Sequence, residues 1–254
     1  MSSTAFTKSQ GNKEGLGELI KTILYAGALA MCIRFTIAQP FRIPSGSMQP
    51  TLLVGDYMVV SKWSYGYSRF SFEPLNFGAP HGRLFGKAPE RGDVIVFRPE
   101  PQLDKDLVKR LIGMPGDTLQ VRGGAVYING EPLKRESLGV VTFKEQTGDY
   151  SEIQAWKETL PNGVSYTTFD REEEGRLDDT PAYEIPEGHY FFMGDDRDNS
   201  ADSRVLDQVG YVPLENLVGK VQFVFLSYDP STSLFKPWTW ILDARPSRFF
   251  KILK

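Results

Sequence analysis

Two serines in a proline-bounded stretch are the residues best suited to chemistry in this sequence. Ser45 and Ser47 lie in PSGSMQP, where Pro44 and Pro50 bracket them and Gly46 permits a sharp turn. Proline fixes φ, so we expect a rigid loop that leads into a strand. A nucleophile must be held close to its attack position, and a rigid loop meets that need. The pattern predicts a serine nucleophile, although such a loop alone is also typical of an ordinary turn.

A serine hydroxyl needs a base, and histidine is nearly absent. The chain has two histidines, His81 and His189, and neither has a triad-like context, so we interpret both as surface or loop residues. No Ser-x-x-Lys motif of the penicillin-binding type occurs in a suitable place. A lysine can serve if burial lowers its pKa from about 10.4 and leaves the amine neutral. A drop of roughly 2 to 3 units costs about 3 to 4 kcal/mol, which the fold must supply.

Lys109 has a suitable setting for such a base. It lies in DLVKRLIGMPGD, a predicted half-buried strand on which Leu107 and Leu111 share its face while Arg110 points the other way. A lysine on an apolar face is unusual and indicates a buried amine. The alternative is a strand edge with the ammonium in solvent.

A run of short polar residues, GDDRDNSADSR, exceeds what a turn needs. Asp196, Asp198, Ser200 and Asp202 fall at alternate positions, as at the start of an EF-hand calcium loop. Ala201 holds the place of the required glycine, so we expect no calcium. With one cysteine and two histidines in the chain, we expect no metal of the zinc type either.

An apolar segment precedes these motifs and predicts a membrane anchor. It runs from Leu19 to Ile37 and can cross a bilayer if Lys21 and Arg34 extend their charges toward the interfaces. A cleavable signal peptide and a buried core helix are the alternatives. We predict an N-terminal cytoplasmic tail over 1–18 and an uncleaved transmembrane anchor over 19–38.

Two-residue alternation begins after Pro40 and predicts β-strands. The expected fold is therefore mainly β, with an N-terminal transmembrane helix followed by an antiparallel β-sheet catalytic domain. The segment over 131–186 is more polar and alternates less, so we expect it to form the outer part of an inserted smaller β subdomain, with the acidic run REEEGRLDD solvated. We place the catalytic domain at 39–117 and 187–254 and the inserted subdomain at 118–186. The expected strands are Asp56–Lys62, Gly92–Arg98, Leu107–Ile112, Asp117–Arg122, Val126–Ile128, Gly188–Met193 and Lys220–Ser227.

The charge balance gives no reason to expect nucleic acid as a partner, because 29 basic residues stand against 32 acidic ones. The single cysteine, Cys32, excludes an intrachain disulfide. The carboxyl-terminal segment SLFKPWTWILDARPSRFFKILK mixes aromatic and basic residues, which suits a membrane interface, with packing against the β domain as the alternative. These residues are Trp238, Trp240, Phe249, Phe250, Lys236, Arg245, Arg248, Lys251 and Lys254.

Five stretches, in order, closely resemble the motif boxes of bacterial type I signal peptidases, whose fold is shared with LexA-like peptidases. They are PSGSMQPTL, GDYMVVSK, RGDVIVF, VKRLIGMPGD and GDDRDNSADSR. The resemblance runs from about Phe41 to Arg204 and implies a Ser–Lys serine endopeptidase that needs no cofactor. It implies that Ser47 attacks the scissile carbonyl and that Lys109 is the general base.

The same resemblance implies further roles. The Ser47 N–H and the Ser45 hydroxyl form an oxyanion hole, and Ser200 orients the Lys109 amine. Asp196 departs from the family, which often has asparagine there. Ion pairs that hold the polar run in place are implied for Asp195 and Asp202 with Arg110 and Arg204. Walls of shallow substrate pockets, which admit small side chains such as alanine, are implied for Phe41, Ile43, Pro44, Met48, Leu52, Met58, Val96, Leu107 and Val108.

The resemblance therefore implies a signal peptidase that cleaves signal-peptide-bearing pre-proteins after Ala-x-Ala. It implies a single-pass protein of the cell inner membrane, in contact with the lipid bilayer, with its catalytic domain on the periplasmic side. A membrane-tethered binding module and a self-cleaving Ser–Lys repressor-type peptidase are the alternatives. The repressor-type class has no membrane anchor.

Overall fold

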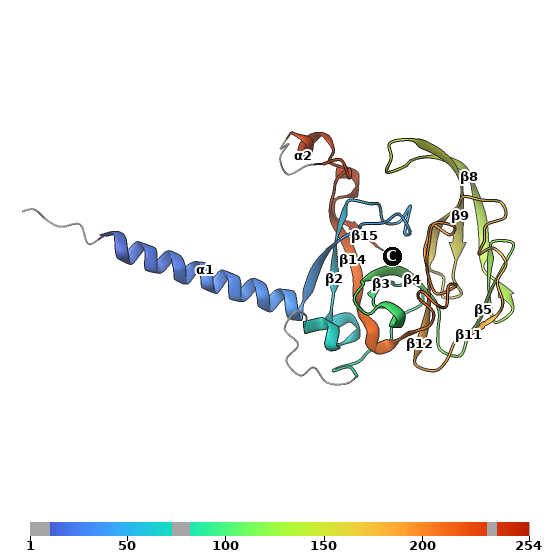
Figure 1. The fold of residues 1–254 in the computed structure, drawn as a ribbon, viewed down its shortest axis with the longest axis horizontal. Helices are drawn as coiled ribbons and strands as arrows, with labels where there is room; N and C mark the ends of the chain where they lie inside the picture. Colours follow the sequence, from blue (N-terminus) through green and yellow to red (C-terminus); the bar gives the residue numbers. More distant parts are fainter. Residues whose placement is uncertain (1–10, 73–81, 233–237, 254) are drawn as a thin grey trace, which may run out of the picture.

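A long helix, α1 (Gly11–Thr36), precedes a mainly β body in this computed structural model (Figure 1). The structure describes residues 11–72, 82–232 and 238–253. The predictions for residues 1–10, His81, Lys236 and Lys254 lie outside the described residues. The expected mainly β class with an N-terminal apolar helix is confirmed.

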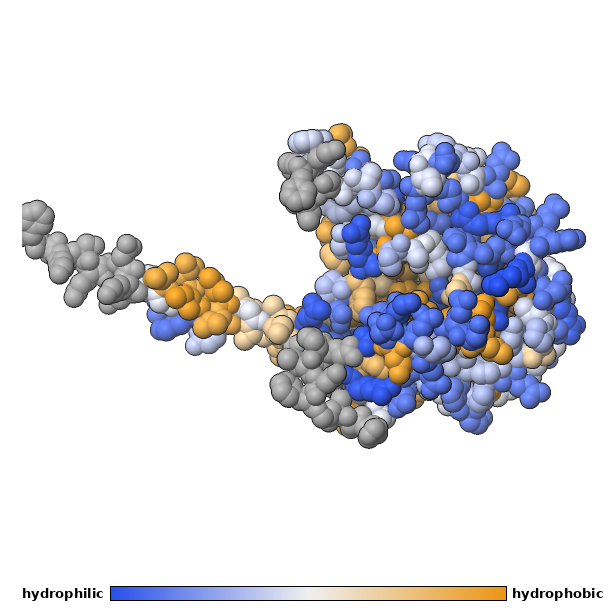
Figure 2. Space-filling view, in the orientation of Figure 1, coloured by the Kyte–Doolittle hydropathy of each residue, from blue (hydrophilic) through white to orange (hydrophobic). Residues whose placement is uncertain are grey.

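The apolar side chains of α1 stand free of the body (Figure 2). The stretch Gly15–Arg34 is apolar and long enough to cross a membrane, and none of it is buried. This stretch extends about 30 Å, the thickness of a hydrocarbon core, and the whole of α1, with 26 residues, extends about 39 Å. The alternative of a buried core helix is therefore wrong.

One residue, Ile37, connects α1 to the sheet. Its N–H donates to Ile33 O at 2.8 Å and its carbonyl accepts from Lys62 N at 3.2 Å. The helix ends at Thr36, earlier than the predicted anchor, and Ala38 already pairs with the second strand. The N–H and the carbonyl of Ile37 are thus both hydrogen-bonded, and the helix continues into the sheet without a longer linker.

The main sheet is antiparallel and has eight strands, in the order β1-β2-β14-β3-β4-β12-β13, with β15 paired to β14. Its central strands are rich in Val, Ile and Phe, and every residue of β3 is buried because apolar clusters cover both of its faces. The strands are β1 (Ala38–Arg42), β2 (Asp56–Ser61), β3 (Val94–Phe97), β4 (Leu107–Gly113), β12 (His189–Met193), β13 (Val212–Pro213), β14 (Leu217–Ser227) and β15 (Lys251–Ile252).

Two smaller sheets lie between β4 and β12 in the chain. One has four strands in the order β11-β5-β6-β7, and the other has three in the order β10-β9-β8. Figure 1 shows them stacked on the side of the body away from α1. Their strands are β5 (Thr118–Arg122), β6 (Ala125–Ile128), β7 (Glu131–Pro132), β8 (Lys134–Lys144), β9 (Tyr150–Thr159), β10 (Ser165–Asp170) and β11 (Tyr183–Glu184).

All seven expected strands occur, with ends that differ by no more than three residues, whereas β8, β9 and β10 were not expected individually. Most residues of β8 are exposed and only Val141 and Phe143 of this strand pack against an apolar cluster, so it shows little alternation. Short helical turns complete the described fold: Trp63–Tyr65, Arg69–Phe72, Glu100–Gln102, Leu214–Asn216, α2 (Thr239–Leu242) and Pro246–Arg248.

Candidate active site

The serine loop, residues 44–52, forms a tight turn between β1 and β2. Gln49 N donates to Gly46 O at 2.9 Å, which closes the turn around Ser47. The Ser47 side chain is buried by this turn and by its neighbours, with 8% of the residue exposed. Ser45 is exposed, two residues away. The loop thus presents one serine to the interior and one to solvent.

The predicted sharp turn begins at Gly46, but glycine is needed there for space and not for its backbone conformation. Its φ is not positive. A Cβ at this position would lie 3.1 Å from Gln49 Oε1 and 3.2 Å from Asn199 Nδ2. The glycine therefore lets a side chain of the serine loop and one of the polar run approach its backbone.

Strand β4 brings Lys109 to this loop, and the Lys109 ammonium is hydrogen-bonded to Ser47 Oγ. Lys109 is 3% exposed, so the alternative of an ammonium in solvent is wrong. Its neighbour Arg110 is 1% exposed. This part of β4 is therefore buried on both faces, and the expectation of a half-buried strand is wrong here.

Burial lowers the pKa of the Lys109 ammonium to about 8. The carboxylates of Asp202, Asp195 and Asp196 favour the charged form and oppose this effect, while Arg204 adds to it. About a tenth of the amine is then neutral at pH 7. A neutral amine bonded to a serine hydroxyl can accept the hydroxyl proton, which is the chemistry of a general base.

Two buried ion pairs hold the polar run beside the lysine. Asp195 accepts from Arg110 Nε at 2.9 Å and Nη2 at 2.7 Å, and the Thr51 hydroxyl donates to it at 2.5 Å. Asp202 accepts from Arg204 Nε at 2.9 Å. Burial pushes the pKa of the Asp202 carboxyl up, but Arg204 and the hydrogen bonds from Gly194 N and the Ser200 hydroxyl together outweigh it, so the pKa lies below its usual value. Asp202 therefore stays charged, and Thr51 ties the Arg110–Asp195 pair to the serine loop.

Ser200 lies at the same place but does not bond the amine. Its hydroxyl donates to Asp202 Oδ2 at 2.7 Å, and within the described residues no hydrogen bond joins it to Lys109. A Cβ at Gly194 would clash with Ser200 Oγ and lie 2.5 Å from Ser47 O. Glycine at position 194 therefore allows the polar run to meet the serine loop.

Most of the predicted wall residues belong to one apolar cluster around the serine loop. Pro44 is exposed instead. Leu107 packs with Ile95 and Phe97 in a different cluster, because neighbouring residues of a strand face opposite sides. The structure brings together Phe41, Ile43, Met48, Leu52, Met58, Val96 and Val108.

The family model described as "Signal peptidase, peptidase S26" matches residues 16–226, which include every residue of the site described above. The chain belongs to this signal peptidase family. The expected serine endopeptidase of the hydrolase class is therefore confirmed. Signal peptidase I of Rickettsia typhi is 40% identical and covers 89% of each chain, and that of Rickettsia felis is 38% identical and covers 97% of this chain and 96% of its own. A crystal structure of a signal peptidase I from Enterococcus faecalis is 28% identical, covers 53% of this chain and 97% of its own, and has a TM-score of 0.30.

In this signal peptidase the stretch over 150–171 forms a wall directly behind the polar run, which was not expected. Phe169 N donates to Asp195 O at 2.8 Å, and Arg197 N donates to Phe169 O at 2.9 Å, so β10 lies alongside the run. Glu158 of β9 receives both terminal nitrogens of Arg197 and is 1% exposed. No local pattern indicated these contacts, since their partners lie far apart in the sequence.

The acidic run is solvated only in part. Glu172, Glu173 and Glu174 are exposed, as predicted for REEEGRLDD. Its first residue, Arg171, instead bonds the buried Asp196, and Asp178 is 6% exposed. The expectation of a solvated face is wrong at these two positions, because their partners come from the polar run and from turns of the run itself.

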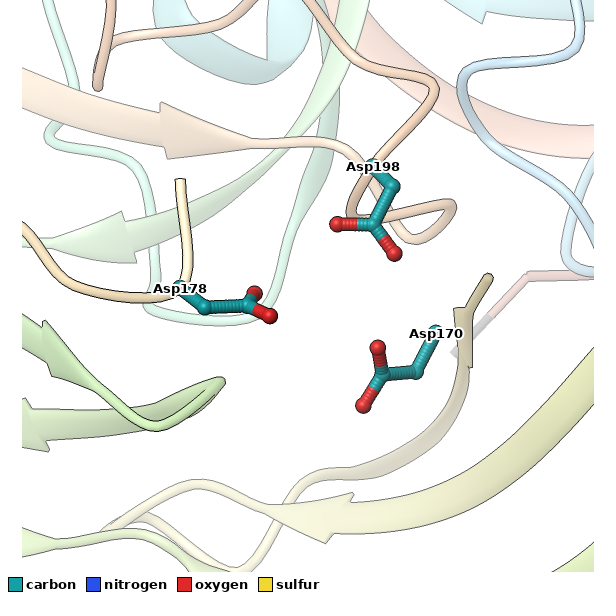
Figure 3. Close-up of side chains that lie close together, drawn as sticks. All are labelled: Asp170, Asp178 and Asp198. Carbon is teal, nitrogen blue, oxygen red and sulfur yellow. The ribbon is translucent and has the colours of Figure 1, made fainter. Parts of the chain in front are cut away.

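Asp178 lies in a group of three carboxylates with Asp170 and Asp198, whose oxygens come within 4.8 Å of one another (Figure 3). Arg135 Nη2 donates to Asp170 at 2.7 Å. The N–H of Arg171 donates to Asp198 at 2.7 Å. The group thus joins the end of β10, the acidic run and the polar run through protein donors.

Proposed function

We propose that this signal peptidase removes signal peptides from exported precursor proteins with Ser47 as nucleophile and Lys109 as general base. The observation that carries the proposal is the hydrogen bond between the buried Lys109 amine and the Ser47 hydroxyl. A base within reach of a hydroxyl in a dry setting is what activation of serine requires.

The reaction follows in two stages. Lys109 Nζ accepts the Ser47 proton as Oγ attacks the scissile carbonyl, and the same proton then passes to the departing amine when the peptide bond breaks. The product of this stage is an ester between Ser47 and the signal peptide, an acyl-enzyme. In the second stage Lys109 takes a proton from water, which attacks the ester, and returns that proton to Ser47 Oγ as the ester bond breaks and the signal peptide leaves.

We assign the oxyanion hole to the Ser47 N–H and the Ser45 hydroxyl. Within the described residues the Ser47 N–H donates no hydrogen bond, and the Ser45 side chain is exposed and makes none. Two uncommitted donors beside the nucleophile can meet the negative oxygen of the tetrahedral intermediate. Ser200 is assigned the orienting role, because its hydroxyl donates to Asp202 and keeps its lone pairs for the ammonium that forms on Lys109.

The apolar cluster around the serine loop supports a preference for small residues before the cut. Leu52, Met58 and Val96 are fully buried, so they close the site from behind and leave little depth for a substrate side chain. A shallow apolar surface accepts alanine and excludes larger groups by contact. This supports cleavage after Ala-x-Ala.

The test uses the full-length protein in detergent with an exported precursor that has alanine one and three residues before the cut. We expect cleavage after the nearer alanine, identified by sequencing the new amino terminus. A precursor with tryptophan at that position should be cut at least about tenfold more slowly, because the shallow surface cannot admit the ring. No cleavage of the alanine precursor would overturn the proposed function, and equal rates would overturn the pocket assignment.

The apolar α1 helix and the family together describe a membrane-anchored enzyme. We further propose that it lies in the inner membrane with the β body on the periplasmic side. Exposed apolar residues at the carboxyl end support contact with the bilayer, since α2 projects from the side of the body from which α1 leaves (Figure 1). These residues are Trp238, Trp240, Ile241, Leu242, Phe250 and Ile252.

Protease protection tests this orientation. When the outer membrane is opened but the inner membrane is intact, added protease should digest the β body, because the proposed topology leaves it outside the cytoplasm. A cytoplasmic marker protein serves as the control for an intact inner membrane. Full protection of the β body until detergent is added would contradict the proposal.

A further inference from the structure

The carbonyl of Ser47 is held by the polar run, and this contact depends on a buried carboxylate. Asp196 N donates to Ser47 O at 3.1 Å. The Asp196 side chain is fully buried, and burial raises the pKa of its carboxyl while Arg171 opposes that rise. A buried carboxylate needs a partner to remain charged and in place.

Arg171 supplies most of that partnership. Its Nε donates to both Asp196 oxygens at 2.8 and 3.0 Å, and its Nη2 donates to Oδ2 at 2.8 Å. Asn199 Nδ2 contributes a longer bond of 3.3 Å. The guanidinium therefore fixes the carboxylate in a forked, bidentate geometry that an ammonium could not reproduce.

The same guanidinium reaches the serine loop itself. Arg171 Nη2 donates to Gln49 Oε1 at 3.2 Å, and the Gln49 side chain covers Gly46. Arg171 thus contacts residues on two sides of the nucleophile: Gln49, two residues after it, and Asp196, which binds its carbonyl.

Arg171 is in turn fixed from behind. It follows β10 directly, and its own N–H donates to Asp198 Oδ2 at 2.7 Å. Its Nη1 donates to Glu145 Oε1, in the β8–β9 turn, at 2.6 Å. The residue is only partly exposed, at 20% of its side chain. Its backbone and its guanidinium are both hydrogen-bonded. A shift of the segment over 118–186 would therefore move Arg171 and, with it, the serine loop.

We propose that Arg171 is a positioning residue of this peptidase, which holds the Ser47 loop in its reactive geometry through Asp196 and Gln49. The inference rests on the proposed role of Ser47. It assigns to the segment over 118–186 a part in positioning the nucleophile, beyond its packing. Misplacement of a reacting group by a contact one residue removed costs up to about 100-fold in rate.

The experiment compares Arg171→Ala with Arg176→Ala in the full-length enzyme. Arg176 belongs to the same acidic run and is exposed, so the two variants lose the same charge from the same segment. For Arg171→Ala we expect kcat to fall about 10- to 100-fold with little change in KM, because the serine and not the substrate surface is displaced. Arg176→Ala should keep the wild-type kcat.

Recovery of kcat by a second substitution distinguishes a positioning role of Arg171 from a role in stability alone. The double variant Arg171→Ala with Asp196→Asn removes the buried charge together with its partner, so the Asp196 N–H can again hold Ser47 O. We expect it to recover at least about tenfold of the lost kcat, with the midpoint of thermal unfolding recorded for every variant. If Arg171→Ala fails to fold, kcat is compared between the double variant and Asp196→Asn alone. Neither of these two variants leaves an unpaired buried charge at position 196.

The inference is overturned if Arg171→Ala lowers the unfolding midpoint yet keeps the wild-type kcat, or if kcat falls and removal of the Asp196 charge restores none of it. Either result would leave the proposed function intact, provided that the wild-type enzyme cleaves the precursor and Ser47→Ala does not. Loss of cleavage in the wild type itself would instead remove the proposed function.

Discussion

Ser47→Ala is expected to lower the rate of precursor cleavage by at least about 10⁴-fold while leaving the protein folded. Removing the nucleophile of a serine peptidase leaves only the contribution of binding and of the oxyanion donors. The side chain is small and, among the residues that the structure describes, is hydrogen-bonded only to Lys109, so its loss creates no sizeable cavity. The measurement is the single-turnover cleavage rate, with the circular dichroism spectrum recorded to show that the fold persists.

Two matched serine variants sharpen this result. Ser247 is exposed, and Ser247→Ala should keep the wild-type rate. Ser45→Ala removes one of the two proposed oxyanion donors and should cost about 10²- to 10³-fold, less than loss of the nucleophile. Cleavage by Ser47→Ala at a rate close to that of the wild type would refute the assignment of the nucleophile.

Lys109→Met is expected to abolish cleavage to a similar extent, because Lys109 is the base bonded to the Ser47 hydroxyl and the described part of the chain places no second base there. In the wild type, the lysine must be neutral to act, and its pKa is lowered to about 8. The value of kcat/KM should therefore rise about tenfold per pH unit below pH 8 and level off above it. A profile that levels off near the pKa of histidine, about 6.5, would contradict the assignment.

The same substitution should stabilise the fold at neutral pH. The unfolded chain keeps its ammonium up to about 10.5, whereas the folded chain releases the proton near 8, so this lysine destabilises the fold below pH 8. The difference corresponds to about 3 kcal/mol, which Lys109→Met should recover at pH 7 and lose progressively between pH 8 and 10.5. Urea unfolding at several pH values measures it.

Lys62 is the matched control for the pH–rate profile and for the stability measurement. It is also a buried lysine, 1% exposed, but it donates to the carbonyl of Ser71 and not to a hydroxyl at the site. Lys62→Met should leave the shape of the pH–rate profile unchanged whatever it does to stability. Loss of the alkaline ionisation in this variant would mean that the profile does not belong to Lys109.

The motifs allowed the main elements of the site to be predicted because each is local. Prolines on either side of Ser47 restrict the loop, and a lysine between apolar residues indicates an unusual setting for its amine. That β4 is buried on both faces at Lys109 and Arg110 could not be predicted in this way. It depends on the serine loop and the polar run, which reach β4 only through tertiary packing.

Arg171 shows the limit most clearly. In the sequence it opens a run of acidic residues, and a charged run is usually solvated. Its role depends on Asp196, 25 residues later, and on Gln49, 122 residues earlier. Strand β8 was equally hidden because most of its residues are exposed, and β9 and β10 were hidden because polar residues such as Glu158 and Thr168 occupy buried positions in them.

The junction at Ile37 constrains the whole enzyme as well as one turn of chain. Because α1 enters β1 with a single, fully bonded residue between them, the catalytic body has no slack to swing away from the bilayer. The five residues of β1, roughly 17 Å of extended chain, then separate this junction from the serine loop. We therefore expect the distance from the bilayer to Ser47 to be fixed, so that this distance as well as the side chains before the cut limits which peptide bond is cleaved.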